Sequence, residues 1–165
     1  MSQGLQAVER QIRDIPDPEI PVITVDDLGI VRGIDREGDR LIVTITPTYS
    51  GCPAMGAITD AIHSVARRYG FDAEVRTQLW PAWTTDWISD QGRESLRRFG
   101  IAPPGPAVDP AEQGPVAIGV SLRQVSCPQC GSSDTEELSR FGGTACKALR
   151  RCRSCSEPFE EFKAL

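Results

Sequence analysis

The apolar positions at the start of the chain recur every three or four residues, which is the period of an amphipathic helix. These positions are Leu5, Val8, Ile12 and Ile15. Pro16 ends the pattern, because a proline disfavours helical backbone at the residue before it. The chain is therefore predicted to begin with a helix that presents one apolar face.

Two β-rich runs follow this helix, over residues 22–34 and 39–49. Residues 35–39, with the sequence DREGD, separate the two runs and have the composition of a hairpin connection. A further strand is predicted over residues 73–79. Together the runs predict a small sheet of three strands.

A long apolar face lies between the second and third predicted strands, covers four helical turns and ends at Gly70. Its members are Ala54, Ala57, Ile58, Ala61, Ile62, Val65, Ala66 and Tyr69. A short helix is predicted over Asp90–Phe99, with Ser89 as its N-cap and Gly100 at its end. The order of elements predicts an α+β fold in which helices pack on a three-stranded sheet.

The chain is divided by a proline-rich stretch over residues 101–115, which holds five prolines and two glycines. Such a stretch is typical of an extended, semi-rigid connector. It separates a first domain, residues 1–100, from a second, residues 116–165. The first is long enough to bury a core. The second is shorter than most domains that fold by hydrophobic burial alone, so it is expected to need a covalent or metal crosslink.

The composition is that of a globular protein, with 165 residues, 39% of them hydrophobic and 25% charged. These values exclude a disordered chain, and no apolar run is long enough to span a bilayer. The first residues lack the basic and apolar segments of a signal peptide, so we expect a cytoplasmic protein. Six cysteines in a reducing compartment are not expected to form disulfides.

The charge distribution does not favour nucleic-acid binding, which usually requires a clear excess of basic residues. The net charge is −5, and residues 1–100 carry fifteen acidic and eleven basic side chains. One basic cluster stands out, and we interpret it as a solvated face. It consists of Lys147, Arg150, Arg151 and Arg153.

Four cysteines have the spacing of a metal site: two C-x2-C pairs separated by 21 residues. They are Cys127, Cys130, Cys152 and Cys155. Each pair brings two sulfurs together in one tight turn, and two such turns supply the four thiolates that zinc prefers. An iron–sulfur cluster could use the same ligands. A structural zinc in a small ribbon is favoured, since a domain this short needs metal-binding energy to fold.

The strands flanking the cysteine pairs are expected over 116–125, 141–149 and 159–162. A fifth thiol, Cys146, lies within the loop between the pairs and has two interpretations. It is either a small buried strand residue or an alternative ligand that permits metal exchange or cluster transfer. Four protein ligands leave no open coordination position, so this metal is not expected to be catalytic.

Cys52 stands apart from the other cysteines, in the sequence TPTYSGCPA between a predicted strand and the long helix. Proline is favoured at the first helical position, so Pro53 makes Cys52 the expected N-cap. A thiol at a helix N-terminus is expected to have a lowered pKa and to be reactive or iron-binding. The alternative is a buried structural cysteine.

Acidic residues near these elements could complete a transient metal site with Cys52. Asp17 and Glu19 flank Pro18, and Asp26 and Asp27 lie in the first β-rich run. Ordinary helix-end and turn chemistry would explain the same residues equally well. Three tryptophans also gather in LWPAWTTDW, where one or two should fill the core and an exposed remainder would form a docking hot spot. They are Trp80, Trp83 and Trp87.

Several of these motifs resemble a known family. The first hundred residues resemble the iron–sulfur-assembly domain of the Suf-system T protein and its relatives in four motifs: DPEIPV, DDLGIV, TPTYSGCPA and PAWTTDW. Followed by CPQCGS and FGGTACKALRRCRSCSEPFEEFK, they resemble the D subunits of bacterial phenylacetyl-CoA epoxygenase (phenylacetate-CoA oxygenase) systems over nearly the full length. The resemblance assigns an assembly-type domain to residues 1–100 and a zinc ribbon to residues 116–165.

The resemblance implies an accessory role in aerobic phenylacetate catabolism, with the oxygenase and reductase subunits as partners. Cys52, with Asp17 and Glu19, would handle iron or an iron–sulfur cluster for a partner subunit. The chain has no Glu-x-x-His pair of the kind that builds a di-iron site, so it is not expected to be the catalytic oxygenase. A non-catalytic adaptor subunit and, less favoured, a thiol-dependent enzyme are the alternatives. Self-association stays open.

Overall fold

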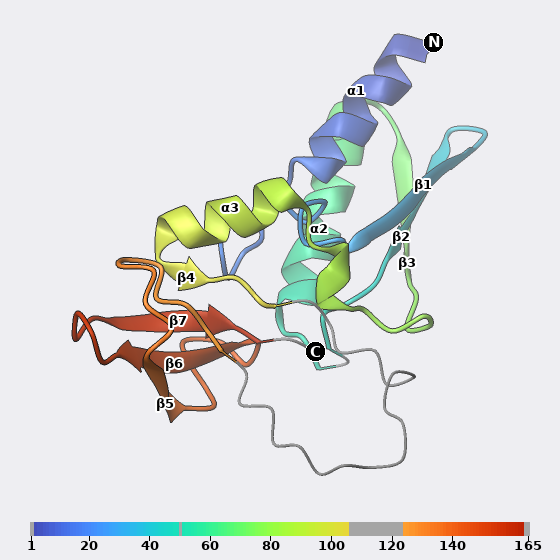
Figure 1. Ribbon diagram of the computed structural model, residues 1–165. Helices are drawn as coiled ribbons and strands as arrows, with labels where there is room; N and C mark the ends of the chain where they lie inside the picture. The colour runs from blue at the N-terminus through green and yellow to red at the C-terminus, as the bar shows by residue number, and fades with distance from the viewer. Residues whose placement is uncertain (1, 50, 106–123, 164–165) are drawn as a thin grey trace, which may run out of the picture. The chain divides into compact units, whose positions relative to one another are not determined.

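The computed structural model describes residues 2–49, 51–105 and 124–163 (Figure 1). The chain forms two compact units, Met1–Ser95 and Leu96–Leu165, and their boundary falls within a helix. Most of the predicted connector, residues 106–115, lies outside the described residues. The domain limits 1–100, 101–115 and 116–165 therefore stay a prediction.

The first unit is built on a three-stranded sheet in the order β1-β2-β3. Strand β1 (Val31–Glu37) pairs antiparallel with β2 (Arg40–Ile45) through a turn at Gly38, whose φ of 63° suits glycine. Strand β3 (Asp72–Thr77) pairs parallel with β2. The α+β fold with a three-stranded sheet is thus confirmed.

The first β-rich run was predicted as a strand over residues 22–34, and this is wrong for residues 22–30. These residues form turns, held by local bonds such as Ile30 N–H to Val25 O at 2.9 Å. The apolar side chains of the run are nevertheless buried in the core: Ile23, Val25, Leu28 and Ile30. Burial, not strand pairing, accounts for the apolar character of this run.

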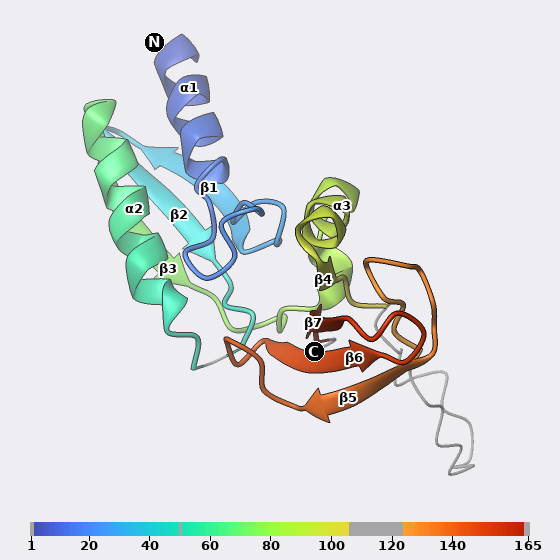
Figure 2. The same cartoon turned by 90° about the vertical axis from the view of Figure 1, so that its left-hand side faces the viewer.

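Helices α1 (Ser2–Arg13) and α2 (Ala54–Arg68) cover one face of this sheet (Figure 2). The buried stripe of α2 is narrower than the predicted apolar face, because only every fourth residue reaches the core. The buried residues are Ala54, Ile58, Ile62 and Ala66. Tyr69, expected in this stripe, follows the helix end and is 41% exposed.

Helix α3 (Asp90–Phe99) has the predicted limits and the predicted cap. Ser89 Oγ accepts a hydrogen bond from Gly92 N–H at 2.9 Å, and Gly100 closes the helix with a φ of 91°. The short 3-10 helix η1 (Thr85–Trp87) precedes it. The start of α3 is therefore set by local sequence, as the pattern indicated.

The second unit is a four-stranded sheet in the order β4-β7-β6-β5. Its strands are β4 (Ile101–Ala102), β5 (Thr135–Ser139), β6 (Lys147–Cys152) and β7 (Pro158–Phe162). Strand β4 pairs parallel with β7, and the other pairs are antiparallel. A small core lies against the sheet, made of Ala102, Val125, Cys127, Cys152 and Phe159.

The predicted strands of the ribbon are only partly found. The strand at 159–162 is confirmed by β7, whereas the strand at 141–149 starts only at Lys147. Strand β5 was not anticipated. Most of the strand predicted at 116–125 lies outside the described residues.

The interpretation of the basic cluster as a solvated face is wrong for two of its four members. Lys147 is buried and its Nζ lies 2.6 Å from Glu160, and Arg150 Nη1 lies 3.1 Å from the buried Glu161. Glutamates on β5 and β7 thus neutralise the basic residues of β6. Desolvation is tolerated because each cation has a paired carboxylate.

Candidate metal centre and thiol site

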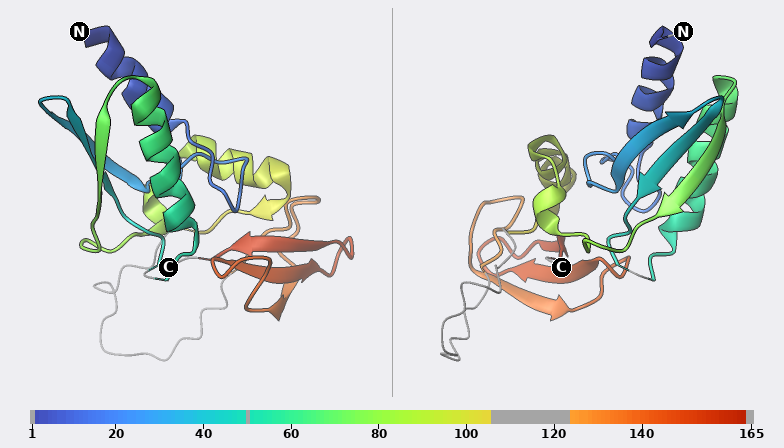
Figure 3. Two further views of the ribbon diagram at one scale, coloured as in Figure 1. Left: turned by 180° about the vertical axis from the view of Figure 1, so that it is seen from behind. Right: turned by 90° about the vertical axis from the view of Figure 1, so that its right-hand side faces the viewer.

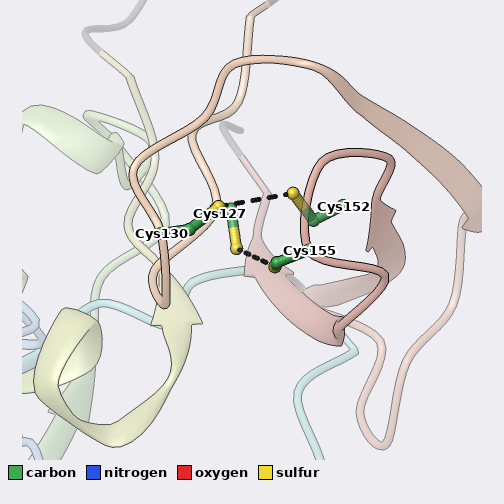
Figure 4. A group of neighbouring side chains, drawn as sticks. All are labelled: Cys127, Cys130, Cys152 and Cys155. Carbon is green, nitrogen blue, oxygen red and sulfur yellow. Dashed lines mark hydrogen bonds between the residues drawn. The ribbon is translucent and has the colours of Figure 1, made fainter.

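The four cysteines of the two C-x2-C pairs converge on one point in the second unit (Figure 4). All four Sγ atoms lie within 4.8 Å of one another. Cys127 Sγ is 3.8 Å from Cys155 Sγ, and Cys130 Sγ is 3.6 Å from Cys152 Sγ. These distances are too long for disulfides, whose sulfurs are about 2.05 Å apart, and the thiols are free.

Two tight turns place these thiols. In the first, Gly131 N–H donates to Cys127 O at 2.9 Å, and the φ of 74° at Gly131 is one that glycine adopts without strain. In the second, Cys152 N–H donates to Glu157 O at 2.9 Å. The second turn joins β6 to β7, and two hydrogen bonds tie it to the segment that follows the first turn: Ser132 Oγ to Ser154 Oγ at 2.7 Å and Arg153 N–H to Asp134 O at 2.9 Å.

The thiol geometry fits a tetrahedral zinc ion. Zn–S bonds of about 2.3 Å place the four sulfurs about 3.8 Å apart, close to the two distances given above. Backbone N–H groups of Cys155 and Ser154 lower the pKa of the Cys152 thiol to about 6, whereas burial and the neighbouring thiols raise the pKa of Cys155 to about 12. The thiols therefore do not all ionise on their own, and a bound cation would stabilise the four thiolates together. The four-thiol set is a structural zinc site with no position left for a substrate.

Cys146 lies outside this group of thiols. It is buried just before β6, and its Sγ lies 3.0 Å from Thr144 Oγ1. Its surroundings agree with the interpretation as a small buried residue at the edge of a strand. Its role as an alternative ligand stays a prediction.

Cys52 lies at the edge of the first sheet where β2 and β3 both end. In the chain, helix α2 connects the parallel strands β2 and β3. It runs back along the face of the sheet, so its N-terminus lies at this same edge (Figure 3). The helix begins at Ala54 with Pro53 as its N-cap, which corrects the prediction that Cys52 is the cap. Cys52 is the residue before the cap and is partly buried.

The pKa of Cys52 is raised, whereas the sequence predicted that the helix N-terminus would lower it. Burial is the largest cause, and the negative charges of Glu19 and Asp17 add to it. Hydrogen bonds from Ala54 N–H and from the Thr48 side chain act in the opposite direction but are outweighed. The surroundings of Cys52 therefore disfavour the thiolate.

The structure brings Asp17 and Glu19 close enough to Cys52 to act on its charge. The buried Asp17 shapes this approach, because its Oδ1 accepts hydrogen bonds from Glu19 N–H at 2.9 Å and Ile20 N–H at 2.8 Å. Among the described residues, only the four-cysteine group has three or more ligand atoms within 4.8 Å of each other. Cys52, Asp17 and Glu19 thus form a charged neighbourhood and not a closed metal cage.

Asp26 and Asp27 have structural roles. Asp26 forms an ion pair with Arg13, and Asp27 accepts hydrogen bonds from the side chains of Thr24 and Ser89. Ser89 N–H also donates to Asp27 O at 2.8 Å. The DDLG motif therefore anchors the start of α3.

The three tryptophans have different environments. Trp83 is buried and donates its Nε1–H to Leu28 O at 2.8 Å. Trp87 is half-buried under the guanidinium of Arg32, 3.6 Å from the ring centroid. Trp80 is 84% exposed. The prediction that one or two fill the core and the rest is exposed is confirmed.

Sequence reasoning missed Thr48 as part of the thiol site. Its buried side chain hydrogen-bonds Cys52 and lowers the pKa of the thiol. The residue lies within the TPTYSGCPA motif, and a hydroxyl four residues before a predicted functional thiol was the available signal. Its contact depends on how the loop after β2 folds back.

Two family models match the sequence. Residues 5–76 match the model described as iron–sulfur cluster assembly protein, and residues 112–163 match the PaaD zinc beta ribbon domain. The second match covers all four clustered cysteines. Within the described residues, no helix is both long enough and apolar enough to cross a bilayer.

Two curated proteins resemble the chain. It is 46% identical over 155 residues to the D subunit of the "Putative 1,2-phenylacetyl-CoA epoxidase" of Escherichia coli (strain K12), covering 93% of this chain and 89% of that protein. It is 33% identical over 97 residues to "Fe-S protein maturation auxiliary factor" of Porphyromonas gingivalis (strain ATCC BAA-308 / W83), covering 57% of this chain and 91% of that protein.

A solved structure supports the fold of the first unit. The domain of unknown function DUF59 from Bacillus anthracis aligns with a TM-score of 0.52 and 21% sequence identity. The alignment covers 58% of this chain and 92% of that structure.

Proposed function

This chain belongs to the family of the Escherichia coli epoxidase D subunit, and from that premise we propose that it is an accessory maturation protein of a multicomponent phenylacetyl-CoA epoxygenase. It assists the assembly of iron or iron–sulfur centres in partner subunits during aerobic phenylacetate catabolism in the cytoplasm. The partners are the oxygenase and reductase subunits. The match of residues 5–76 to the iron–sulfur cluster assembly model supports this role.

The observation that carries the proposal is the setting of Cys52. Its thiol is partly buried, its pKa is raised, and it lies near the carboxylates of Asp17 and Glu19. These negative charges oppose the thiolate but attract a cation. Iron binding at Sγ would displace the thiol proton to solvent, so the same charges that keep Cys52 protonated favour its metal-bound form.

The open arrangement of this site favours transfer over storage. A resident ion needs several ligands held close together, as in the four-cysteine group, and Cys52, Asp17 and Glu19 are not held in that way. A donor or acceptor subunit can then supply the remaining ligands. The zinc of the second unit has a separate task, which is to stabilise the ribbon.

The direct test is Cys52→Ser in a strain that expresses the epoxygenase subunits. We expect the iron content of the reductase or oxygenase, measured by metal analysis after anaerobic purification, to fall severalfold. The variant itself should keep its zinc and its circular dichroism spectrum, because Cys52 lies in the other unit. Cys146→Ser is the matched control, since it removes a thiol that lies outside the Cys52 neighbourhood. Unchanged iron content with Cys52→Ser would contradict the proposal.

A second function, that of a non-catalytic adaptor subunit, is favoured by one observation, the large exposure of Trp80. An adaptor would bind the oxygenase stably and would not depend on the thiol. Co-purification with the oxygenase together with full iron content in the Cys52→Ser strain would support this function in place of maturation.

A further inference from the structure

Large apolar side chains are exposed at few places in the described residues. They are Tyr69, Leu79, Trp80, Phe99, Leu138 and Phe141. Leu79 and Trp80 are the adjacent pair among them, with 60% and 84% of their surface exposed. Truncating either side chain would therefore leave no cavity in the core. An exposed tryptophan beside an exposed leucine is a typical protein-binding anchor.

The position of this pair in the fold links it to Cys52. Strand β3 ends at Thr77 beside Ile45, the last residue of β2, and Gln78 N–H donates to Ile45 O at 2.8 Å. Leu79 and Trp80 follow directly. The loop after β2 leads to Cys52 and the start of α2, so both loops leave the β1-β2-β3 sheet at the same edge, which is its lower end in Figure 1.

Tyr69 is an exposed aromatic residue of the same unit that lies far from Cys52. It follows the C-terminal end of α2, and its N–H bonds Ala66 O in the last turn. Because α2 runs antiparallel to β2, this end lies at the opposite edge of the sheet, near the start of β3. Tyr69 is thus exposed and aromatic but remote from the thiol.

The acidic charge of the first unit indicates that a partner bound at Leu79 and Trp80 has a basic surface. Its residues include fifteen acidic and nine basic side chains. Glu19, which is partly exposed, lies at the edge in question and is close enough to raise the pKa of Cys52, while the charge of the buried Asp17 lies behind it. A surface with this charge complements one that is lined by Lys and Arg.

We propose that Leu79 and Trp80 anchor the subunit that exchanges metal with Cys52, by inserting into an apolar pocket on a basic surface of that subunit. This inference rests on the proposed function, because it takes the acceptor to be an epoxygenase subunit. The anchor and the thiol lie at one edge, so a subunit bound to Trp80 covers Cys52 as well. Transfer then needs no separate docking element.

The experiment titrates zinc-loaded full-length protein against the purified reductase and the purified oxygenase complex, by biolayer interferometry at low and high salt. We expect Trp80→Ala to weaken binding to one of them at least about tenfold, and Leu79→Ala to weaken it less. Tyr69→Ala, the matched control, should bind like the unaltered protein. Higher salt should weaken binding, since the charges that guide association are screened.

Three results would overturn the inference: unaltered binding by Trp80→Ala and Leu79→Ala, absence of binding to both partners, or a dimer of this chain that Trp80→Ala converts to a monomer. The last would identify a second copy as the occupant, and sedimentation detects it. Cys52→Ser separates the two proposals, because it should bind normally yet fail to support iron loading. If iron loading of the partner is normal with Cys52→Ser but Trp80→Ala no longer binds the partner, the maturation role is contradicted and the docking role of Trp80 is retained.

Discussion

At the scale of single residues, the sign of the Cys52 pKa shift decides how this thiol can work. A helix N-terminus favours a thiolate, but burial and two carboxylates outweigh it here. Cys52 is therefore a poor nucleophile at neutral pH. It becomes a ligand when a cation compensates the negative charge that forms, which suits metal handling better than covalent catalysis.

Two substitutions should move the pKa of Cys52 in opposite directions. Glu19→Gln removes a negative charge and should lower the pKa, whereas Thr48→Val removes a hydrogen bond to the sulfur and should raise it. The rate of iodoacetamide labelling against pH, read on the Cys52 peptide by mass spectrometry, measures both changes. In the unaltered protein the midpoint should lie above the usual value of about 8.5. A midpoint at or below that value would contradict the burial argument.

At the scale of secondary structure, the charged residues of the ribbon hold neighbouring strands together. Arg150 on β6 and Glu161 on β7 form an ion pair in which the side chains are only 11% and 4% exposed. Arg150 Nη2 also donates to Thr135 Oγ1 on β5 at 3.3 Å. One buried guanidinium thus links three strands, in a domain with a small apolar core.

Glu161→Gln should destabilise the second unit, because it removes the nearer and more buried of two countercharges from a buried guanidinium: Glu161 lies 3.1 Å from Arg150 Nη1, and the more exposed Glu137 lies 4.0 Å away. Losing one member of a buried pair costs about 3–5 kcal/mol. Glu136→Gln is the matched control, since Glu136 pairs with the exposed Arg153 at 2.9 Å and such pairs contribute little. Zinc release against urea concentration, followed with a chromogenic chelator, reports the unfolding of this unit. Equal midpoints for the two variants would contradict the prediction.

At the scale of the whole molecule, the two units derive their stability from different sources. The first buries apolar residues from α1, α2 and its sheet, including Val8, Ile12, Leu41, Val43 and Ile62. The second has a buried cluster in which two of the zinc ligands, Cys127 and Cys152, pack with Ala102, Val125 and Phe159. Structural zinc supplies about 10–16 kcal/mol in comparable small domains, more than such a core provides.

Chelation of zinc should therefore unfold the second unit and leave the first folded. All three tryptophans lie in the first unit, so their fluorescence reports that unit alone. We expect one of two calorimetric transitions to disappear after zinc removal, with the fluorescence transition unchanged. Cys130→Ser should reproduce this loss, whereas Cys146→Ser should retain zinc. Zinc loss in Cys146→Ser would instead indicate that Cys146 takes part in metal binding.

The sequence by itself determined the features that depend on neighbouring residues. The two C-x2-C pairs, the limits of α3 with its Ser89 cap, and the order of strands and helices in the first unit all follow from local spacing. Local spacing suffices because a tight turn or a helix cap is formed within a few residues of chain. The convergence of the two pairs is not local, and it was predicted from the four thiolate ligands that zinc prefers.

Only the tertiary structure decided the features that depend on burial and on charges distant in sequence. It showed that residues 22–30 form turns, that Lys147 and Arg150 are buried in ion pairs, and that the pKa of Cys52 is raised. Glu19 and Cys52 are 33 positions apart in the sequence, and no local pattern states that they meet. The electrostatics of a site depend on its solvent exposure and its neighbours in space, which only the folded chain establishes.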